Sequence, residues 1–151
     1  MIHVFIPSFQ NSVMRKKLML VAFSSLLINA VYSQQKQHKI VFDFTKSDTA
    51  SFSTFVRHAS NIMSLTGNTK IEIVCHGPGL DMLMKEKTTV QKEIAELSEK
   101  FNVVFAACEA TMKRRGVDKS QLIAQAITVP AAILELSSKE EDGWSYVKEG
   151  Y

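Results

Sequence analysis

Short apolar runs alternate with amphipathic segments along the chain from His38 onward. Runs rich in β-branched and aromatic residues predict strands at 38–45, 69–77, 102–107, 126–129 and 143–150. After the first run, apolar residues recur at helical spacing, with Asp48 as a cap and Gly67 as a stop. The apolar face of this predicted helix comprises Phe52, Phe55, Val56, Ala59, Ile62 and Met63. Shorter helices are predicted at 79–86, 90–101, 108–115, 119–125 and 131–140.

Local end signals agree with this order of elements. Asp118 and Gln121 form a capping box, and Pro130 suits the first turn of a helix. The last segment, with Trp144 and Tyr146 on one face, is predicted as a strand, with an irregular tail as the alternative. Strands alternating with helices indicate an α/β fold: a three-layer αβα sandwich around a mostly parallel, five-stranded, flavodoxin-like sheet. In that strand order, strand one lies between strands two and three.

The first 33 residues have the pattern of an export signal. "MRKK" at residues 14–17 is a basic start, a serine-interrupted apolar stretch follows, and "VYS" at 31–33 offers a cleavage site. We therefore expect a signal peptide at 1–33, with 1–13 as an upstream extension, and a folded domain at 34–151. The expected location is periplasmic or secreted in a bacterium, without a stable membrane anchor, because the apolar stretch is too short to span comfortably. The alternative is an uncleaved anchor.

Charge argues against a nucleic-acid partner. The whole chain carries a net charge of +3, from 18 basic and 15 acidic residues. Arg15, Lys16 and Lys17 lie in the predicted leader, which holds no acid, and without them the basic residues fall to 15. The remaining chain is therefore neutral, and no basic patch with interleaved aromatic residues is present in the sequence.

Cys108 follows the third predicted strand and opens a helix. Ligand sites in open parallel sheets lie outside the carboxyl ends of the strands. Unpaired backbone N–H groups at a helix start favour a thiolate over a thiol, so this position predicts a reactive sulfur, although Glu109 beside it works against a second negative charge. Lys113, Arg114 and Arg115 are expected to form a solvated face at the far end of the helix. The alternative for Cys108 is a small buried residue at a tight junction.

The turn after the second strand is the second candidate. His76 lies at the strand exit and could orient or protonate a bound molecule, while Gly77 and Gly79 could offer backbone N–H groups to an anion. Turn geometry is the first explanation of both glycines, and a histidine in this position more often simply caps the turn. Cys75 precedes His76, but adjacent strand residues point to opposite faces, so Cys75 is expected in the core.

The two cysteines are expected to stay unpaired. With strand one between strands two and three, Cys75 and Cys108 would lie about 9 to 10 Å apart, beyond the roughly 7 Å that a disulfide tolerates. The histidines show no metal-ligand spacing with each other or with the cysteines, so we expect no metal or other cofactor.

Three segments together resemble the DsrE/DsrF-like family, which includes sulfur-relay subunits such as TusD. They are "IEIVCHGPGLDML", "FNVVFAACEATMKRRGV" and "ITVPAAILELSSKEEDGWSYVKEG". The resemblance covers residues 38–151 and implies a five-stranded α/β fold in trimers or hexamers. It also implies that Cys108 matches the cysteine that carries a persulfide between a sulfur donor and an acceptor protein.

Two functions from different classes follow. The first is an exported sulfur carrier or sulfurtransferase that forms a persulfide on Cys108, with His76 near the sulfur. The second is a homo-oligomeric binding module without turnover, in which the apolar "VPAAILEL" and the aromatic tail build a subunit interface. A thiol that senses oxidation through a sulfenic acid is a third hypothesis.

Overall fold

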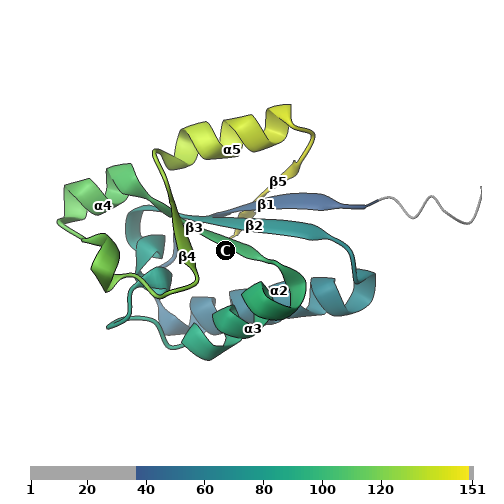
Figure 1. Cartoon of the computed structure of the whole chain (residues 1–151), viewed down its shortest axis with the longest axis horizontal. Coiled ribbons are helices and arrows are strands. Elements are labelled where there is room, and N and C mark those ends of the chain that lie inside the picture. The colour runs from purple at the N-terminus through teal and green to yellow at the C-terminus, as the bar shows by residue number, and fades with distance from the viewer. Residues whose placement is uncertain (1–36, 150–151) are drawn as a thin grey trace, which may run out of the picture. The chain divides into compact units, whose positions relative to one another are not determined.

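The computed structural model describes residues 37–149, so the predicted leader at 1–33 lies outside the described residues. The division between leader and domain stays a prediction. In the described part, the strands are β1 (Lys39–Phe44), β2 (Lys70–Cys75), β3 (Val104–Cys108), β4 (Ala126–Val129) and β5 (Ser145–Glu149). The α-helices are α2 (Thr49–Thr66), α3 (Gln91–Phe101), α4 (Glu109–Arg115) and α5 (Ala132–Glu141). Two 3₁₀ segments, η1 (Gly77–Leu83) and η2 (Lys119–Gln121), complete the order (Figure 1).

The five strands form one sheet in the order β4-β3-β2-β1-β5, and every neighbouring pair is parallel. The predicted α/β class with a five-stranded flavodoxin-like sheet is therefore confirmed. The predicted position of the first strand is wrong, because β2 and not β1 lies beside β3. The connections from β1 to β2, from β2 to β3 and from β3 to β4 each move the chain one strand in the same direction. The last connection returns the chain to the other side of β1, where β5 lies.

This path decides which helix covers which face. A right-handed connection places its helix on one face when the chain steps in one direction and on the other face when it steps back. The steps from β1 to β2 and from β2 to β3 put α2 and α3 together below the sheet, whereas the return from β4 to β5 puts α5 above it (Figure 1).

The two faces bury different side chains. The face towards α2 and α3 carries the larger core, with Phe42, Phe44, Ile71, Ile73, Cys75 and Phe105 from the strands. The Phe44 and Phe55 rings pack in a tilted arrangement with their centroids 5.1 Å apart. The face towards α5 has smaller residues: Val41, Val74, Ala106, Cys108 and Val129 pack against Ala132 and Leu136.

Two predicted helices are shorter than the pattern suggested. The segment 79–86 forms the 3₁₀ segment η1 instead of an α-helix, and 119–125 forms only the single turn η2. The Asp118–Gln121 capping box is present, but Leu122 and Ile123 leave the turn to fill the core. In α2, Ile62 is only partly buried, whereas the other five residues of the predicted apolar face are buried. None of the described helices is both long and apolar enough to cross a membrane.

Candidate functional site

Cys108 is the last residue of β3 and the N-cap of α4. Its sulfur accepts hydrogen bonds from two backbone amides, Thr111 N at 3.4 Å and Ala132 N at 3.3 Å. The first amide belongs to the opening turn of α4 and the second to the first residue of α5. Amides at a helix start have no partner within the helix, so they are free to bind a negative sulfur. Two helix starts therefore converge on one thiol.

The pKa of the Cys108 thiol lies below its ordinary value. Burial alone would raise that pKa, but hydrogen bonds from Thr111 and from the Ala132 amide outweigh it. The residue is only 3% exposed. A reactant therefore needs a movement of the segments that cover the sulfur, and the start of α5 is one of them because its amide touches the sulfur.

Cys75 has the opposite surroundings. It is fully buried in the core between the sheet and α2–α3, and both burial and the nearby Asp43 charge raise the pKa of its thiol far above the ordinary value. Both cysteines are free, as predicted. The predicted reason was wrong: the two strands are neighbours, with Cys75 opposite Ala107. The thiols stay apart because the two side chains pack on opposite faces of the sheet.

His76 comes directly after β2. Its backbone continues the hydrogen bonding of the sheet, because its amide donates to Phe44 O of β1 at 3.2 Å. Because Cys75 pairs with Ala107, His76 lies at the register position beside Cys108. Its ring nitrogen Nε2 bonds Asp43 on β1, with Nε2 and Oδ1 2.7 Å apart, which leaves Nδ1 as the free ring nitrogen. The His76 side chain is 27% exposed, so the ring lies at the surface of the carboxyl edge of the sheet.

Asp43 is a nearly buried carboxylate with three partners. Oδ1 bonds His76, and Oδ2 accepts from Tyr146 Oη and Lys148 Nζ, each at 2.8 Å. Burial would raise the pKa of Asp43, but hydrogen bonds from Lys148, Tyr146 and His76 lower it overall. Burial and the Asp43 carboxylate also raise the pKa of Tyr146 to about 12. The strand β5 thus holds the carboxylate in its ionised form.

Sequence reasoning missed Asp43, Tyr146 and Lys148. A signal was present, because Asp43 interrupts the otherwise apolar "KIVFDF" of a buried strand. An ionisable residue in a strand covered on both faces needs partners, since an unpaired buried charge is strongly unfavourable. Those partners come from the chain's last strand, more than 100 residues away, and the sequence did not identify them.

In the turn after β2, both backbone groups of Gly77 are hydrogen-bonded to side chains of α4. Gly77 N–H donates to Thr111 Oγ1 at 3.1 Å, and Arg115 donates to Gly77 O at 2.9 Å. Arg115 also pairs with Asp81, so it braces this turn, whereas Lys113 and Arg114 are exposed as predicted. The predicted solvated face of three basic residues is therefore wrong for Arg115.

The two glycines have structural reasons of their own. Gly77 has a φ of 54°, which side chains rarely adopt, and a Cβ on Gly79 would lie 2.3 Å from Phe44 O. The Gly79 amide donates to His76 O at 3.0 Å. Since both amides already have internal acceptors, the predicted anion site at Gly77 and Gly79 gains no support and stays a prediction.

Other hollows and clusters lie elsewhere. A cavity of about 330 Å³ opens at the amino ends of the strands, lined in part by Lys70, Val104 and Trp144, at the edge opposite Cys108. Within residues 37–149, no three His, Cys, Asp or Glu side chains are grouped so that they could hold a metal ion. The Asp43–His76 pair and the turn at Gly77 lie with Cys108 at the carboxyl edge of the sheet.

The fold and the site define an α/β protein with a helix-capped thiol at the carboxyl edge of a parallel sheet. Residues 38–148 match the DsrE/DsrF-like family, and the chain belongs to that family. The resemblance seen in the sequence is thus confirmed. The curated proteins offer no significant match.

Three solved structures share the fold. The MTH1491 protein of Methanobacterium thermoautotrophicum, of unknown function, is 21% identical, with a TM-score of 0.69 over 74% of this chain and 99% of that one. The ychN protein of E. coli is 14% identical, with a TM-score of 0.61 over 74% and 98% of the two chains. BT1422 of Bacteroides thetaiotaomicron, also of unknown function, is 21% identical, with a TM-score of 0.60 over 73% and 93%. At these identities the likeness concerns the fold alone.

Proposed function

We propose that the protein is an exported sulfur carrier that takes up a sulfane sulfur as a persulfide on Cys108. The observation that carries the proposal is the position of the Cys108 sulfur at two helix starts, where two backbone amides bind it and its pKa is lowered. A thiolate is the form of cysteine that attacks sulfur, and this arrangement favours it. Membership of a family that includes sulfur-relay proteins supports the same chemistry.

The sulfur-transfer step needs no net oxidation. The Cys108 thiolate attacks the outer sulfur of a donor persulfide R–S–SH, the new S–S bond forms at Cys108, and the donor S–S bond breaks. The electron pair of the broken bond leaves with R–S⁻, which then takes up a proton to become R–SH. Transfer to an acceptor thiolate repeats the exchange in the other direction. His76, at the neighbouring register position, is the candidate to supply or remove the proton.

Mass spectrometry of matched cysteine variants tests the proposal. After incubation with a low-molecular-weight persulfide, the wild-type protein is expected to gain about 32 Da, one sulfur atom, on a thiolate. Cys75→Ala should gain the same mass and Cys108→Ala should not. Absence of the adduct from wild type, or an equal adduct on Cys108→Ala, would contradict the proposal.

Export is part of the same proposal. The leader pattern at 1–33 supports a periplasmic or secreted location, which N-terminal sequencing of the protein from the cell envelope would test. A mature chain that begins at Gln34 would support it, whereas a retained leader would favour the uncleaved anchor.

A homo-oligomeric binding module is the second candidate function, and one surface feature favours it. The outer side of α5 exposes Ile133 to 78% and Leu134 to 65%, and Ile127 on the edge strand β4 is 48% exposed. Exposed apolar residues that cluster on one element are typical of a subunit interface. Light scattering is expected to show a trimer or hexamer for wild type and smaller species for Ile133→Lys with Leu134→Lys. If cellular function survives Cys108→Ala but not this double variant, the binding module is the better description.

A further inference from the structure

His76 and Cys108 lie side by side on the same face of the sheet. The pairing of Cys75 with Ala107 places the next residue of each strand opposite the other, and both residues have extended backbone angles. Cys108 packs on the α5 face, and the His76 ring reaches Asp43 on that face. Neighbouring parallel strands lie about 4.8 Å apart, so the side chains of His76 and Cys108 start from adjacent positions on this face.

One residue joins the two sides of this site. Thr111 donates its amide to the Cys108 sulfur and accepts the Gly77 amide on its hydroxyl oxygen. Arg115 donates to the carbonyl oxygen of the same glycine, Gly77. The turn that follows His76 is therefore bonded to the helix that begins after Cys108, while the ring itself is held by Asp43.

The Asp43 carboxylate determines which ring nitrogen carries the proton. Oδ2 accepts from the Tyr146 hydroxyl and the Lys148 ammonium, so the carboxylate is an acceptor only. Its Oδ1 atom therefore requires a hydrogen on His76 Nε2. In the neutral ring this leaves the lone pair on Nδ1, because each tautomer has one donor and one acceptor nitrogen.

We propose that Asp43 is a positioning residue that holds His76 in the Nε2–H tautomer, with Nδ1 exchanging the proton of sulfur transfer at Cys108. This inference rests on the proposed sulfur-carrier function. Nδ1 takes the proton of the Cys108 thiol, the thiolate attacks the donor R–S–SH, and the Nδ1–H of the imidazolium then protonates the leaving R–S⁻. Sulfur moves, one S–S bond replaces another, and the ring returns to its starting form.

Strand β5 belongs to the site in this account. Tyr146 and Lys148 point from β5 to Asp43, whereas Glu149 of the same strand contacts His58 of α2 on the opposite face. Four of the five residues of β5 are exposed and Glu149 is partly buried, so changes in these side chains do not open the core. Variants of Tyr146 or Lys148 therefore remove a hydrogen bond to the Asp43 carboxylate, and a variant of Glu149 is a matched control that leaves these bonds in place.

Two measurements on full-length protein test the inference. Nitrogen-15 NMR reports the His76 tautomer, and the rate of Cys108 alkylation by iodoacetamide at neutral pH reports proton removal without any persulfide. Wild type is expected to show the Nε2–H tautomer. Asp43→Asn is expected to shift the ring towards Nδ1–H and to slow alkylation about tenfold or more, because the ring then has no lone pair on Nδ1.

The β5 variants keep the test decisive if Asp43→Asn folds poorly. Tyr146→Phe and Lys148→Met should each shift the tautomer and the rate in the same direction but less, and Glu149→Gln should leave both unchanged. An unchanged tautomer in the Asp43 and Lys148 variants, or an unchanged alkylation rate despite a changed tautomer, would overturn the inference. Failure of wild type to form a persulfide, with both readouts responding, would instead remove the sulfur-carrier proposal and leave the positioning role of Asp43.

Discussion

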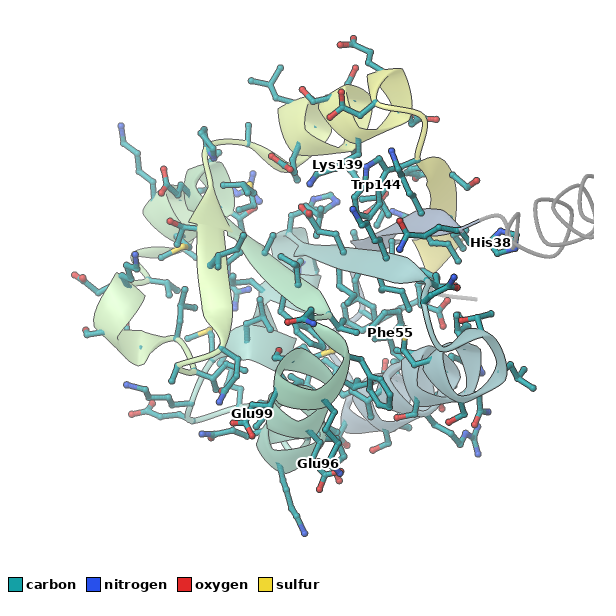
Figure 2. The ribbon with its side chains drawn as sticks, turned by 45° about the vertical axis from the view of Figure 1, so that its right-hand side comes forward. His38, Phe55, Glu96, Glu99, Lys139 and Trp144 are labelled. Carbon is teal, nitrogen blue, oxygen red and sulfur yellow. The ribbon has the colours of Figure 1, made fainter. Side chains whose placement is uncertain are left out.

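The two faces of the sheet differ in what they bury. Towards α2 and α3 the strands present phenylalanine and isoleucine, and the packed Phe42, Phe44 and Phe55 rings leave no charged group among them. Towards α5 the same strands present alanine, valine and Cys108, together with the buried carboxylates Asp43 and Glu72. Figure 2 shows the contrast, with Phe55 in the lower layer and Lys139 beside Trp144 in the upper one. One face supplies stability, and the other holds the polar groups that chemistry needs.

The two cysteines show the same contrast between the two faces at the ends of neighbouring strands. Cys75 and Cys108 end neighbouring strands, yet the first has a raised thiol pKa and the second a lowered one. Both are buried, and burial disfavours the thiolate in each case. Hydrogen bonds account for the difference, since Cys108 receives them from Thr111 and from the Ala132 amide while Cys75 lies among apolar side chains. The face, more than the residue type, determines the chemistry.

The largest effect is expected from the apolar face. Phe55→Ala removes a fully buried ring that packs on both Phe42 and Phe44, and should lower the free energy of unfolding by about 3–5 kcal/mol. Leu136→Ala on the α5 face should lower the free energy of unfolding by about 2 kcal/mol. The loss is smaller because Leu136 is 7% exposed and packs against smaller side chains. Urea unfolding of both variants measures the difference. An equal or larger loss for Leu136→Ala would reverse the comparison.

A smaller effect is expected from the charged pair under α5. Lys139 Nζ lies 2.5 Å from Glu72 Oε2 and 4.8 Å from the Trp144 ring centroid, while Glu72 Oε1 is buried without a partner. Lys139→Met leaves the carboxylate uncompensated. It should lower the free energy of unfolding by about 2–3 kcal/mol at pH 7, somewhat less than for a fully buried pair, since the Lys139 side chain is 21% exposed.

The pH dependence of the Lys139→Met effect identifies its cause. Burial, opposed by Lys139 and reinforced by Glu135, raises the pKa of Glu72 in the folded protein. A raised carboxyl pKa means that the folded state favours the protonated form, so the destabilisation grows as pH rises through the folded pKa and shrinks at acid pH. Unfolding at pH 5 and pH 8 should show a smaller loss at pH 5, and adding Glu72→Gln should recover part of the stability. The same loss at both pH values would rule out an unpaired Glu72 charge as the cause.

The fold was largely predictable from the sequence because its signals are local. Each strand stands out as a β-branched or aromatic run, and Asp48 and Gly67 bound α2 as a cap and a stop. The order of the strands was not predictable, because right-handed connections are compatible with either neighbour for β3. The sequence likewise did not show that 119–125 is a single 3₁₀ turn, since core packing of Leu122 and Ile123 overrides the helical pattern.

The candidate site was predictable only in part. The position of Cys108 at a strand–helix junction follows from adjacent residues, but its second amide donor, Ala132, comes from α5 and depends on the fold. The Asp43–His76 bond joins residues 33 positions apart on neighbouring strands. The acidic residues inside apolar strands, Asp43 and Glu72, were visible signs of a polar face, although their partners were not.

The rate of iodoacetamide alkylation against pH, resolved by peptide mass spectrometry for each cysteine, tests whether the Cys108 thiol ionises more easily than an ordinary thiol. Cys108 of the native protein is predicted to react with a midpoint below the ordinary thiol pKa of about 8.5, and Cys75 only after unfolding. A midpoint for Cys108 at or above that value, or equal reactivity of the two cysteines in the native protein, would contradict the account.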